Sequence, residues 1–485
     1  MSATSAVRSS VDTTTAPASV PRPRLGRAWL PLLYAGLAVA AACVLATRVE
    51  PVLAVALVAF PPLCVALLRV PLLGLALPLA VAPVGLTPLP VGGLQVIHLA
   101  TITAIGGTVV AVLSRQVPFR PPLTLVFGAV FVAAMFAATV GGVSPLASIR
   151  VAANYLLGIC LAVCVGTVVR ASPAGLRWLL RGWTLAATVL VVPALPSALR
   201  VSDQFSGSLV SGRVQGAFAQ PNDFGEFALL GAVAAGALVA SSTLRRDRLL
   251  GVVGLLVGLS GVAVSFSRGA WLGGLVALVT VAVLSPSSRR AVVGLLTLIP
   301  VALVVGALAG AQPFPTLLAR VDSLLTGAEN PADDRPIIYA QALQVFLSHP
   351  VLGVGPGGFL ATNYGADSLL IRRTYLHGHS VVLTVAAEDG IIGVLALLTF
   401  TVALAVAVLA ARRRLLALGA GTLNARLAIL AAGLVGVAAH GLIDVVYTNP
   451  LLIPLLWFLA GLVAGECARV LDARPRPDGP EVVVP

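Results

Sequence analysis

Charged residues are scarce in this chain. They make up 10% of its 485 residues, whereas hydrophobic residues make up 58% and the mean hydropathy is +1.02. A soluble domain carries about 25% charged residues, and a soluble chain of this length could not bury so much apolar surface. The composition therefore excludes a soluble protein and predicts a polytopic membrane protein.

Lysine is absent from the chain and cysteine is rare. All 31 basic residues are arginine, a bias to which we attach no functional weight. The cysteines lie within or at the ends of apolar stretches, and none has a histidine at metal-ligand spacing. This pattern argues against a disulfide framework or a zinc site and predicts that the cysteines pack within the helices. They are Cys43, Cys64, Cys160, Cys164 and Cys467.

Long apolar runs dominate the sequence. In windows of about 20 residues they predict about fourteen spans, with a margin of two. The expected fold is an all-α polytopic membrane protein with about 12–14 transmembrane helices. No short apolar core with a small-residue cleavage site precedes the first span, so we expect no removable signal peptide. The spans fall near 29–47, 51–68, 70–89, 97–113, 122–140, 150–169, 182–199, 224–242, 249–266, 269–284, 291–310, 390–410, 427–443 and 450–467.

The net charge is +13, which in a soluble protein would suggest nucleic acid as a partner. Here the positive-inside rule explains the arginines without a nucleic acid. With both termini cytoplasmic and about fourteen spans, every arginine cluster falls on the cytoplasmic side of the membrane. The clusters are Arg22/Arg24/Arg27, Arg115/Arg120, Arg170/Arg177/Arg181, Arg245/Arg246/Arg248, Arg289/Arg290 and Arg412/Arg413/Arg414.

This topology divides the chain into five parts. Residues 1–28 and 472–485 are rich in proline and arginine and are expected to be disordered cytoplasmic tails. Residues 29–310 are expected to form a bundle of about 11 helices, and residues 390–471 the remaining transmembrane helices. Residues 311–389 form a large, partly helical extracytoplasmic loop. Most polar residues outside the arginine clusters gather on that side, so we expect any chemistry to be extracytoplasmic.

The segment 212–227 lies on the extracytoplasmic side. Asp223 and Glu226, three residues apart, are typical of a capping box at the start of the next span. Asn222 follows a proline and fits the turn before that span. The pattern favours a structural role for these three residues.

Two arginines on this side have no such structural explanation. A cap does not need Arg213, and a guanidinium near the membrane surface is a bidentate partner for phosphate. Arg268 stands between two apolar runs, where it could either snorkel to the interface or bind an anion. Both arginines are candidate ligands of a phosphate group.

The long loop contains one amphipathic helix. The run Asp333-Asp334-Arg335-Pro336 fits a helix start, because proline is favoured in the first turn, and His349-Pro350 ends the helix. Arg335 and Tyr339 share one face of it. The glycine-rich run 353–359 has no strand before it and no Lys-Ser/Thr after it. It therefore predicts a tight turn near a ligand rather than a nucleotide-binding loop.

Two of the five histidines, His377 and His379, lie near the end of the polar loop, shortly before the next span. Histidine titrates nearest to neutral pH, so each could act as a base at the membrane surface, although each could also cap a helix. Gly390 and Gly393 follow, and they predict a turn or close packing of that helix.

These segments together resemble the O-antigen ligase and polymerase family of the Wzy/WaaL type. The family signature is His, then Asn, Ser or Gln, nine residues, Gly, two residues and Gly. His379-Ser380, Gly390 and Gly393 fit it without a gap. The runs 212–222, 267–273 and 334–359 also resemble the family, so the likeness covers about residues 210–395.

The resemblance implies a metal-independent, inverting glycosyltransferase at the outer face of a bacterial inner membrane, without a cofactor. Its donor would be a glycan on a polyprenyl diphosphate such as undecaprenyl diphosphate, and its acceptor a glycan or lipid hydroxyl. His379 would be the catalytic base, with Arg213, Arg335 and Arg268 as diphosphate ligands and His377, Tyr339 and Asn222 in support. The chain has no Asp-x-Asp motif for a metal. Arginines could instead stabilise the leaving diphosphate.

Three activities stay open at this point. We favour a polymerase that joins lipid-linked repeat units for the cell envelope, with membrane lipids, a flippase and a chain-length regulator as further partners. A ligase that moves a finished glycan to another acceptor would use the same motif. A small-anion transporter is the third, kept open by Pro193 and Pro196 within a span.

Overall fold

The computed structural model describes residues 70–81, 85, 87–88, 94–199, 213–218, 220–310, 314–325, 335–362, 377–445 and 448–473. Within these residues the regular elements are helices, and a single bridge between Pro88 and Gln95 is the only β-type pairing. The predicted all-α membrane fold is confirmed. The predicted spans 29–47 and 51–68 and almost all of the two predicted tails lie outside the described residues.

Nine helices in the described part of the chain are long and apolar enough to cross a membrane. Two shorter apolar helices, α5 (Leu125–Thr139) and α10 (Arg268–Leu284), also coincide with predicted spans. The nine are α4 (Val96–Leu113), α6 (Pro145–Ala171), α7 (Pro173–Val191) continued by η3 (Val192–Leu199), α8 (Pro221–Ser241), α9 (Arg245–Val264), α11 (Arg289–Leu308) preceded by η4 (Pro286–Ser288), α15 (Val381–Ala417), α16 (Gly421–Gly441) and α17 (Leu452–Asp472).

The prediction of one continuous span at 70–89 is wrong. The described residues there form two short helices, η1 (Pro71–Ala76) and α3 (Leu77–Ala80), and then a turn at Gly85. A spanning helix needs about 20 residues. Prolines at 71, 78 and 88 explain the difference, because proline removes a backbone donor and obstructs the preceding helical turn.

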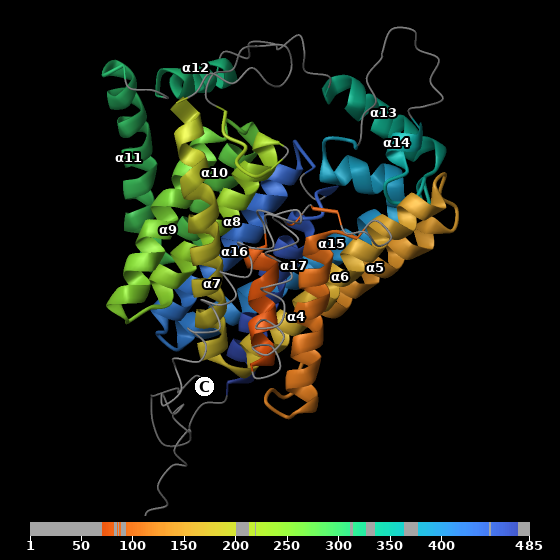
Figure 1. Ribbon diagram of the computed structural model, residues 1–485, viewed down its shortest axis with the longest axis horizontal. Helices are drawn as coiled ribbons and strands as arrows, with labels where there is room; N and C mark the ends of the chain where they lie inside the picture. The colour runs from red at the N-terminus through yellow and green to blue at the C-terminus, as the bar shows by residue number, and fades with distance from the viewer. Residues whose placement is uncertain are drawn as a thin grey trace, which may run out of the picture. The chain divides into compact units, whose positions relative to one another are not determined.

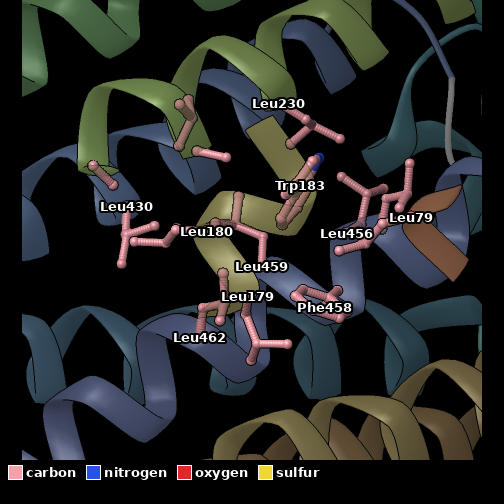
Figure 2. Packing of buried hydrophobic residues seen from close by; sticks show 14 of the residues in the cluster. Leu79, Leu179, Leu180, Trp183, Leu230, Leu430, Leu456, Phe458, Leu459 and Leu462 are labelled. Carbon is pink, nitrogen blue, oxygen red and sulfur yellow. The ribbon is translucent and has the colours of Figure 1, made fainter. Parts of the chain in front are cut away.

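The core lies where α17 and α8 are enclosed by their neighbours. α8 packs against α9, α17 against α6, and α10 against α16 (Figure 1). Figure 2 shows Trp183 of α7 beside Phe458 of α17, and their rings meet edge to face with centroids 5.3 Å apart. Glycines let helices approach closely: a Cβ on Gly273 of α10 would lie 2.6 Å from the carbonyl oxygen of Gly436 of α16.

The arginine-bearing helix ends meet one another. Arg170 at the end of α6 forms an ion pair with Asp472 at the end of α17, at 2.7 Å. Arg414 near the end of α15 donates to the carbonyl of Leu471, also in the last turn of α17. At the opposite end of the bundle lie the starts of α8, α10 and α17 and the end of α16. The candidate site is built at that opposite end.

The predicted loop helix is present as α13 (Arg335–Ser348), and its described start and end agree with the prediction. Two shorter helices, α12 (Phe314–Leu325) and α14 (Phe359–Thr362), flank it along the chain. The inner face of α13 buries Ile338 and Ala342 against Phe359 and Ala387. This contact fixes α13 on the first part of α15, so that Arg335 and Tyr339 face the site.

Candidate functional site

The carboxylate of Asp444 joins four parts of the chain. Oδ1 of Asp444 lies 3.1 Å from Nδ1 of His379 and accepts the backbone N–H of Val445. Oδ2 accepts the side-chain amide of Asn222 at 2.5 Å and lies 3.7 Å from the Arg335 guanidinium. The Asp444 side chain is 8% exposed. Residues from α8, α13, the start of α15 and the α16–α17 connection therefore meet at one buried carboxylate.

The charges around Asp444 keep it ionised. Burial acts to raise its pKa, but the His379 hydrogen bond and the charges of His379, His440 and Arg335 outweigh burial and hold the pKa well below its usual range. Asp444 therefore carries a negative charge at any physiological pH. It can hold a neighbouring imidazole by its N–H and a guanidinium by its charge.

Arg213 reaches the same carboxylate through Asn222. Its guanidinium donates to Oδ1 of Asn222 at 3.0 Å, while Nε donates to the carbonyl of Ser265 at 3.2 Å. Ser265 directly follows α9. Asn222 thus accepts from Arg213 and donates to Asp444, so a chain of three hydrogen bonds connects a second arginine to His379.

His379 is held from several sides and is still accessible. Its backbone φ of +45° lies in the left-handed region, which is uncommon for a residue with a side chain and marks positions fixed by their surroundings. Its carbonyl accepts the Tyr339 hydroxyl at 3.3 Å. The His379 side chain is 30% exposed, compared with 8% for Asp444. The imidazole can therefore meet a substrate while Asp444 fixes its orientation.

His377 packs against His379, with ring centroids 4.5 Å apart. Burial, followed by the charge of His379, lowers the pKa of His377 to about 4, while Asp444 acts in the opposite direction. His377 is therefore neutral near pH 7. The supporting role predicted for His377 beside His379 stays a prediction.

The helix that follows His379 is broken at Gly390. Gly390 has φ +62° and ψ −163° inside α15, so the nine residues Val381–Asp389 form a short arm and the long helix continues beyond the break. A Cβ on Gly390 would lie 2.3 Å from the carbonyl oxygen of Val351. The predicted turn at this glycine is confirmed, and both its backbone conformation and the close approach require glycine.

The glycine-rich turn 350–358 fills that break with backbone hydrogen bonds. Val354 and Gly355 donate to the carbonyls of Ala387 and Glu388, and Ile391 donates to the carbonyl of Pro350 at 2.8 Å. The side chain of Glu388 accepts the backbone N–H of Phe359 at 3.3 Å. The predicted tight turn is confirmed, and its backbone provides hydrogen-bond partners for the backbone groups of α15 at the break.

The predicted capping box at Asp223 and Glu226 is wrong. The residue before α8 is Gln220, and no side-chain cap forms there. Asp223 accepts from Asn449 at 2.7 Å, and Glu226 lies 2.5 Å from Nδ1 of His440. Together with the Asn222–Asp444 bond, three residues in the first two turns of α8 pair with the end of α16 and the connection that follows it.

Arg268 is the first residue of α10, next to Gly269, which packs against the His440 ring. The structure therefore brings His379, Arg335, Asn222, Arg213, Tyr339 and His377 together and places Arg268 beside the His440 layer of the same region. Asp444 and His440 were missed in the sequence. The one available signal is the predicted topology, in which the connection between the last two spans, 427–443 and 450–467, falls on the same side as the histidines.

Comparison with known proteins bears on the same region. Residues 250–398 match the family model described as O-antigen ligase, a stretch that runs from α9 past Gly393 and includes His379, Arg335 and Arg268. The matched stretch is similar to the O-antigen ligase family, whose members ligate or polymerise glycans. The match supports an enzyme of the glycosyl-transfer type that acts on lipid-linked glycans in a membrane. A search of the curated proteins found no match.

The O-antigen ligase match ends before Asp444 and begins after Arg213 and Asn222. The structure nevertheless connects these three residues directly to His379 of the matched stretch. The candidate site is therefore assembled from residues inside and outside the matched segment.

Proposed function

We propose that the chain transfers a glycan from a polyprenyl-diphosphate carrier to an acceptor hydroxyl, with His379 as the general base. The observation that carries the proposal is the contact between His379 and Asp444. When Nδ1 bears the proton and donates it to Asp444, the lone pair of the imidazole lies on Nε2. That nitrogen takes the proton of the acceptor hydroxyl, a contribution typically worth about 10²- to 10⁴-fold in rate.

The acceptor oxygen then attacks the anomeric carbon of the donor. The bond from this carbon to the diphosphate breaks, and the polyprenyl diphosphate leaves with the bonding electrons. Attack from the side opposite the leaving group inverts the anomeric centre. The leaving group carries about two negative charges, and no covalent intermediate with the protein is needed.

Arg335 and Arg213 are the proposed ligands of that diphosphate. Both lie within the network of Asp444, and arginine matches the geometry of phosphate oxygens. Fixed cationic donors in a low-dielectric site stabilise a leaving anion more strongly than the same groups in water. Arg268 at the start of α10 is a third, weaker candidate. In this proposal arginines supply the charge that a metal ion supplies in other glycosyltransferases.

We propose a polymerase of lipid-linked repeat units as the specific activity, located on the extracytoplasmic side of a bacterial inner membrane. The arrangement of arginines at the opposite end of the bundle supports this sidedness under the positive-inside rule. A flippase and a chain-length regulator are the expected partners. The ligase alternative uses the same donor, so the acceptor in the assay separates the two.

The test replaces the chromosomal gene with variants and examines the surface glycan by gel electrophoresis. We expect His379→Ala, Arg213→Ala and Arg335→Ala to abolish the polymer, while Arg170→Ala at the opposite end of the bundle leaves it intact. Normal polymer from His379→Ala would remove the catalytic assignment. Accumulation of single lipid-linked repeat units in the His379 variant indicates a polymerase, whereas accumulation of long lipid-linked chains indicates a ligase.

A further inference from the structure

Beneath Asp444 lies a second pair of ionisable groups. Nδ1 of His440, in the last turn of α16, is 2.5 Å from Oε2 of Glu226 in α8. Both side chains are 0% exposed. Ionisable residues inside a membrane bundle are costly unless they pair with each other, and their presence there points to a role in function. The proposed transfer reaction does not yet use either residue.

The pair is connected to Asp444 from two directions. The backbone N–H of Asp444 donates to the carbonyl of His440 at 3.1 Å, so Asp444 lies on the turn that His440 begins. Glu226 stands one helical turn after Asn222, which donates to the Asp444 carboxylate. The Glu226–His440 contact therefore ties together the two helices that hold the backbone and the side chain of Asp444.

The His440 ring has little room to move. A Cβ on Gly269 would lie 2.0 Å from Cδ2 of His440, so the start of α10 packs directly against the ring. Asp223 of α8 is the other acidic group of this layer, and Asn449 donates to it. His440 is thus enclosed by α8, α10 and its own helix, and a change in its partner is transmitted to Asp444 rather than absorbed by empty space.

We propose that His440 and Glu226 are positioning residues that fix Asp444 and, through Asp444, the orientation of His379. The inference rests on the proposed role of His379 as the base. Neither residue touches substrate in this proposal. Their effect on the reaction comes from the position of the Asp444 carboxylate, because the His379 imidazole is aligned only while that carboxylate stays in place.

The test measures the chemical reactivity of His379 in the purified full-length protein, without any glycan substrate. Diethyl pyrocarbonate modifies the free nitrogen of an imidazole, and peptide mass spectrometry reports the rate at His379. Asp444→Asn shows how much the His379 modification rate changes when the direct hydrogen-bond partner of His379 is altered. We expect Glu226→Gln and His440→Gln each to change the rate about fivefold in the same direction as Asp444→Asn, the effect of one weakened hydrogen bond.

Glu466→Gln is the matched control. Glu466 is also 0% exposed and paired with a base, Arg426, at the other end of α16 and α17. Arg426 and His440 are 14 residues apart on α16, about 21 Å along the helix. We expect this control to lower the thermal unfolding midpoint in detergent and to leave the His379 rate unchanged. If Glu226 has a purely structural role, Glu226→Gln should likewise lower the unfolding midpoint and leave the His379 modification rate unchanged.

The outcomes separate this inference from the proposed function. A wild-type His379 rate in folded Glu226→Gln or His440→Gln would overturn the inference, whichever of the two variants is stable enough to purify. Normal surface polymer from His379→Ala would instead overturn the proposed function, whatever the modification rates are. A changed His379 modification rate together with about 10- to 100-fold less polymer in the Glu226 variant would support both the positioning role and the proposed function. A loss of this size is comparable to that seen when groups that orient metal-bound histidines are replaced.

Discussion

Nδ1 of His379 lies 3.1 Å from Oδ1 of Asp444, although 65 residues separate the two in the chain. The contact gives His379 one fixed nitrogen and one accessible nitrogen, which is the arrangement that a general base needs. It also makes the orientation of His379 depend on a carboxylate outside the segment that matches the O-antigen ligase model. The first prediction concerns that carboxylate.

Replacing Asp444 by Asn should reduce glycan transfer by about 10²-fold or more, because an amide neither carries the charge nor fixes the imidazole tautomer. The protein should still fold, since Asn has nearly the same shape as Asp. Transfer is measured as the initial rate of polymer formation in membranes from the host strain. Asp472→Asn is the control, because Asp472 pairs with Arg170 at the opposite end; an equal loss in both variants would refute the role of Asp444.

Replacing Asn222 by Asp should destabilise the protein by about 2 kcal/mol near neutral pH. The new carboxylate would keep the Arg213 guanidinium on one oxygen, but its other oxygen would stand against Oδ2 of Asp444 and would lose the donated hydrogen bond. Repulsion between the two carboxylates favours a bound proton in the folded state, so the loss grows as pH rises from about 4 to 7. Thermal unfolding in detergent at several pH values measures the effect.

Asn424→Asp provides the comparison for this prediction. Asn424 donates to the carbonyl of Leu284, and Arg412 donates to the same carbonyl oxygen. Both new carboxylates have an arginine nearby, Arg412 here and Arg213 at position 222, but the one at position 222 also stands against the carboxylate of Asp444. The stability of Asn424→Asp should not fall as pH rises, and an identical pH dependence in the two variants would contradict the repulsion argument.

Replacing Gly390 by Ala should destabilise the protein by about 2 kcal/mol or more and should reduce the amount of folded protein. Its conformation, φ +62° and ψ −163°, is essentially restricted to glycine and costs another residue about 1–3 kcal/mol, and the new Cβ would clash with the Val351 carbonyl. Gly419→Ala is the control, since Gly419 has a positive φ of +65° and open space around it. An equal loss of stability in both variants would show that contact between the new Cβ at position 390 and the glycine-rich turn has no measurable cost.

Protonation of His377 should lower the free energy of unfolding as the pH falls. Its pKa of about 4 in the folded protein lies below the ordinary value of 6.5, so the unfolded state binds the proton first. Stability from this residue is complete above about pH 6.5 and is lost as pH falls towards 4, by about 3 kcal/mol in total. His377→Asn should remove this contribution, which appears as a smaller loss of unfolding midpoint between pH 6.5 and 4 than in the unmodified protein.

Much of the fold could be predicted from the sequence, because apolar runs of about 20 residues identify membrane helices whatever they pack against. The pairing of those helices could not be predicted in this way. Asp223 and Glu226 fit a local capping motif, yet their partners Asn449 and His440 lie 226 and 214 residues away. A local motif predicts a local partner, and a buried polar group takes whichever partner the fold brings to it.

The candidate site, like the fold, could be predicted from the sequence only in part. His379, Arg213 and Arg335 could be singled out because imidazole and guanidinium groups in the predicted extracytoplasmic segments suit a diphosphate donor. Asp444 could not, because a single Asp after a span is an ordinary feature of a loop. Its importance comes from the convergence of α8, α13 and the start of α15 on one carboxylate, and that convergence belongs to the fold.

Because the helix is broken at Gly390, the nine-residue spacing after Ser380 fixes the distance between the glycine-rich turn and His379. The glycine-rich turn anchors one end of the arm Val381–Asp389, and His379 stands just beyond the other end, about 14 Å away along the helix. Each residue added to the arm would lift His379 by about 1.5 Å and rotate it by about 100°. In the proposed reaction, the arm length therefore sets both the depth at which the imidazole meets a lipid-held donor and the direction in which it faces Asp444.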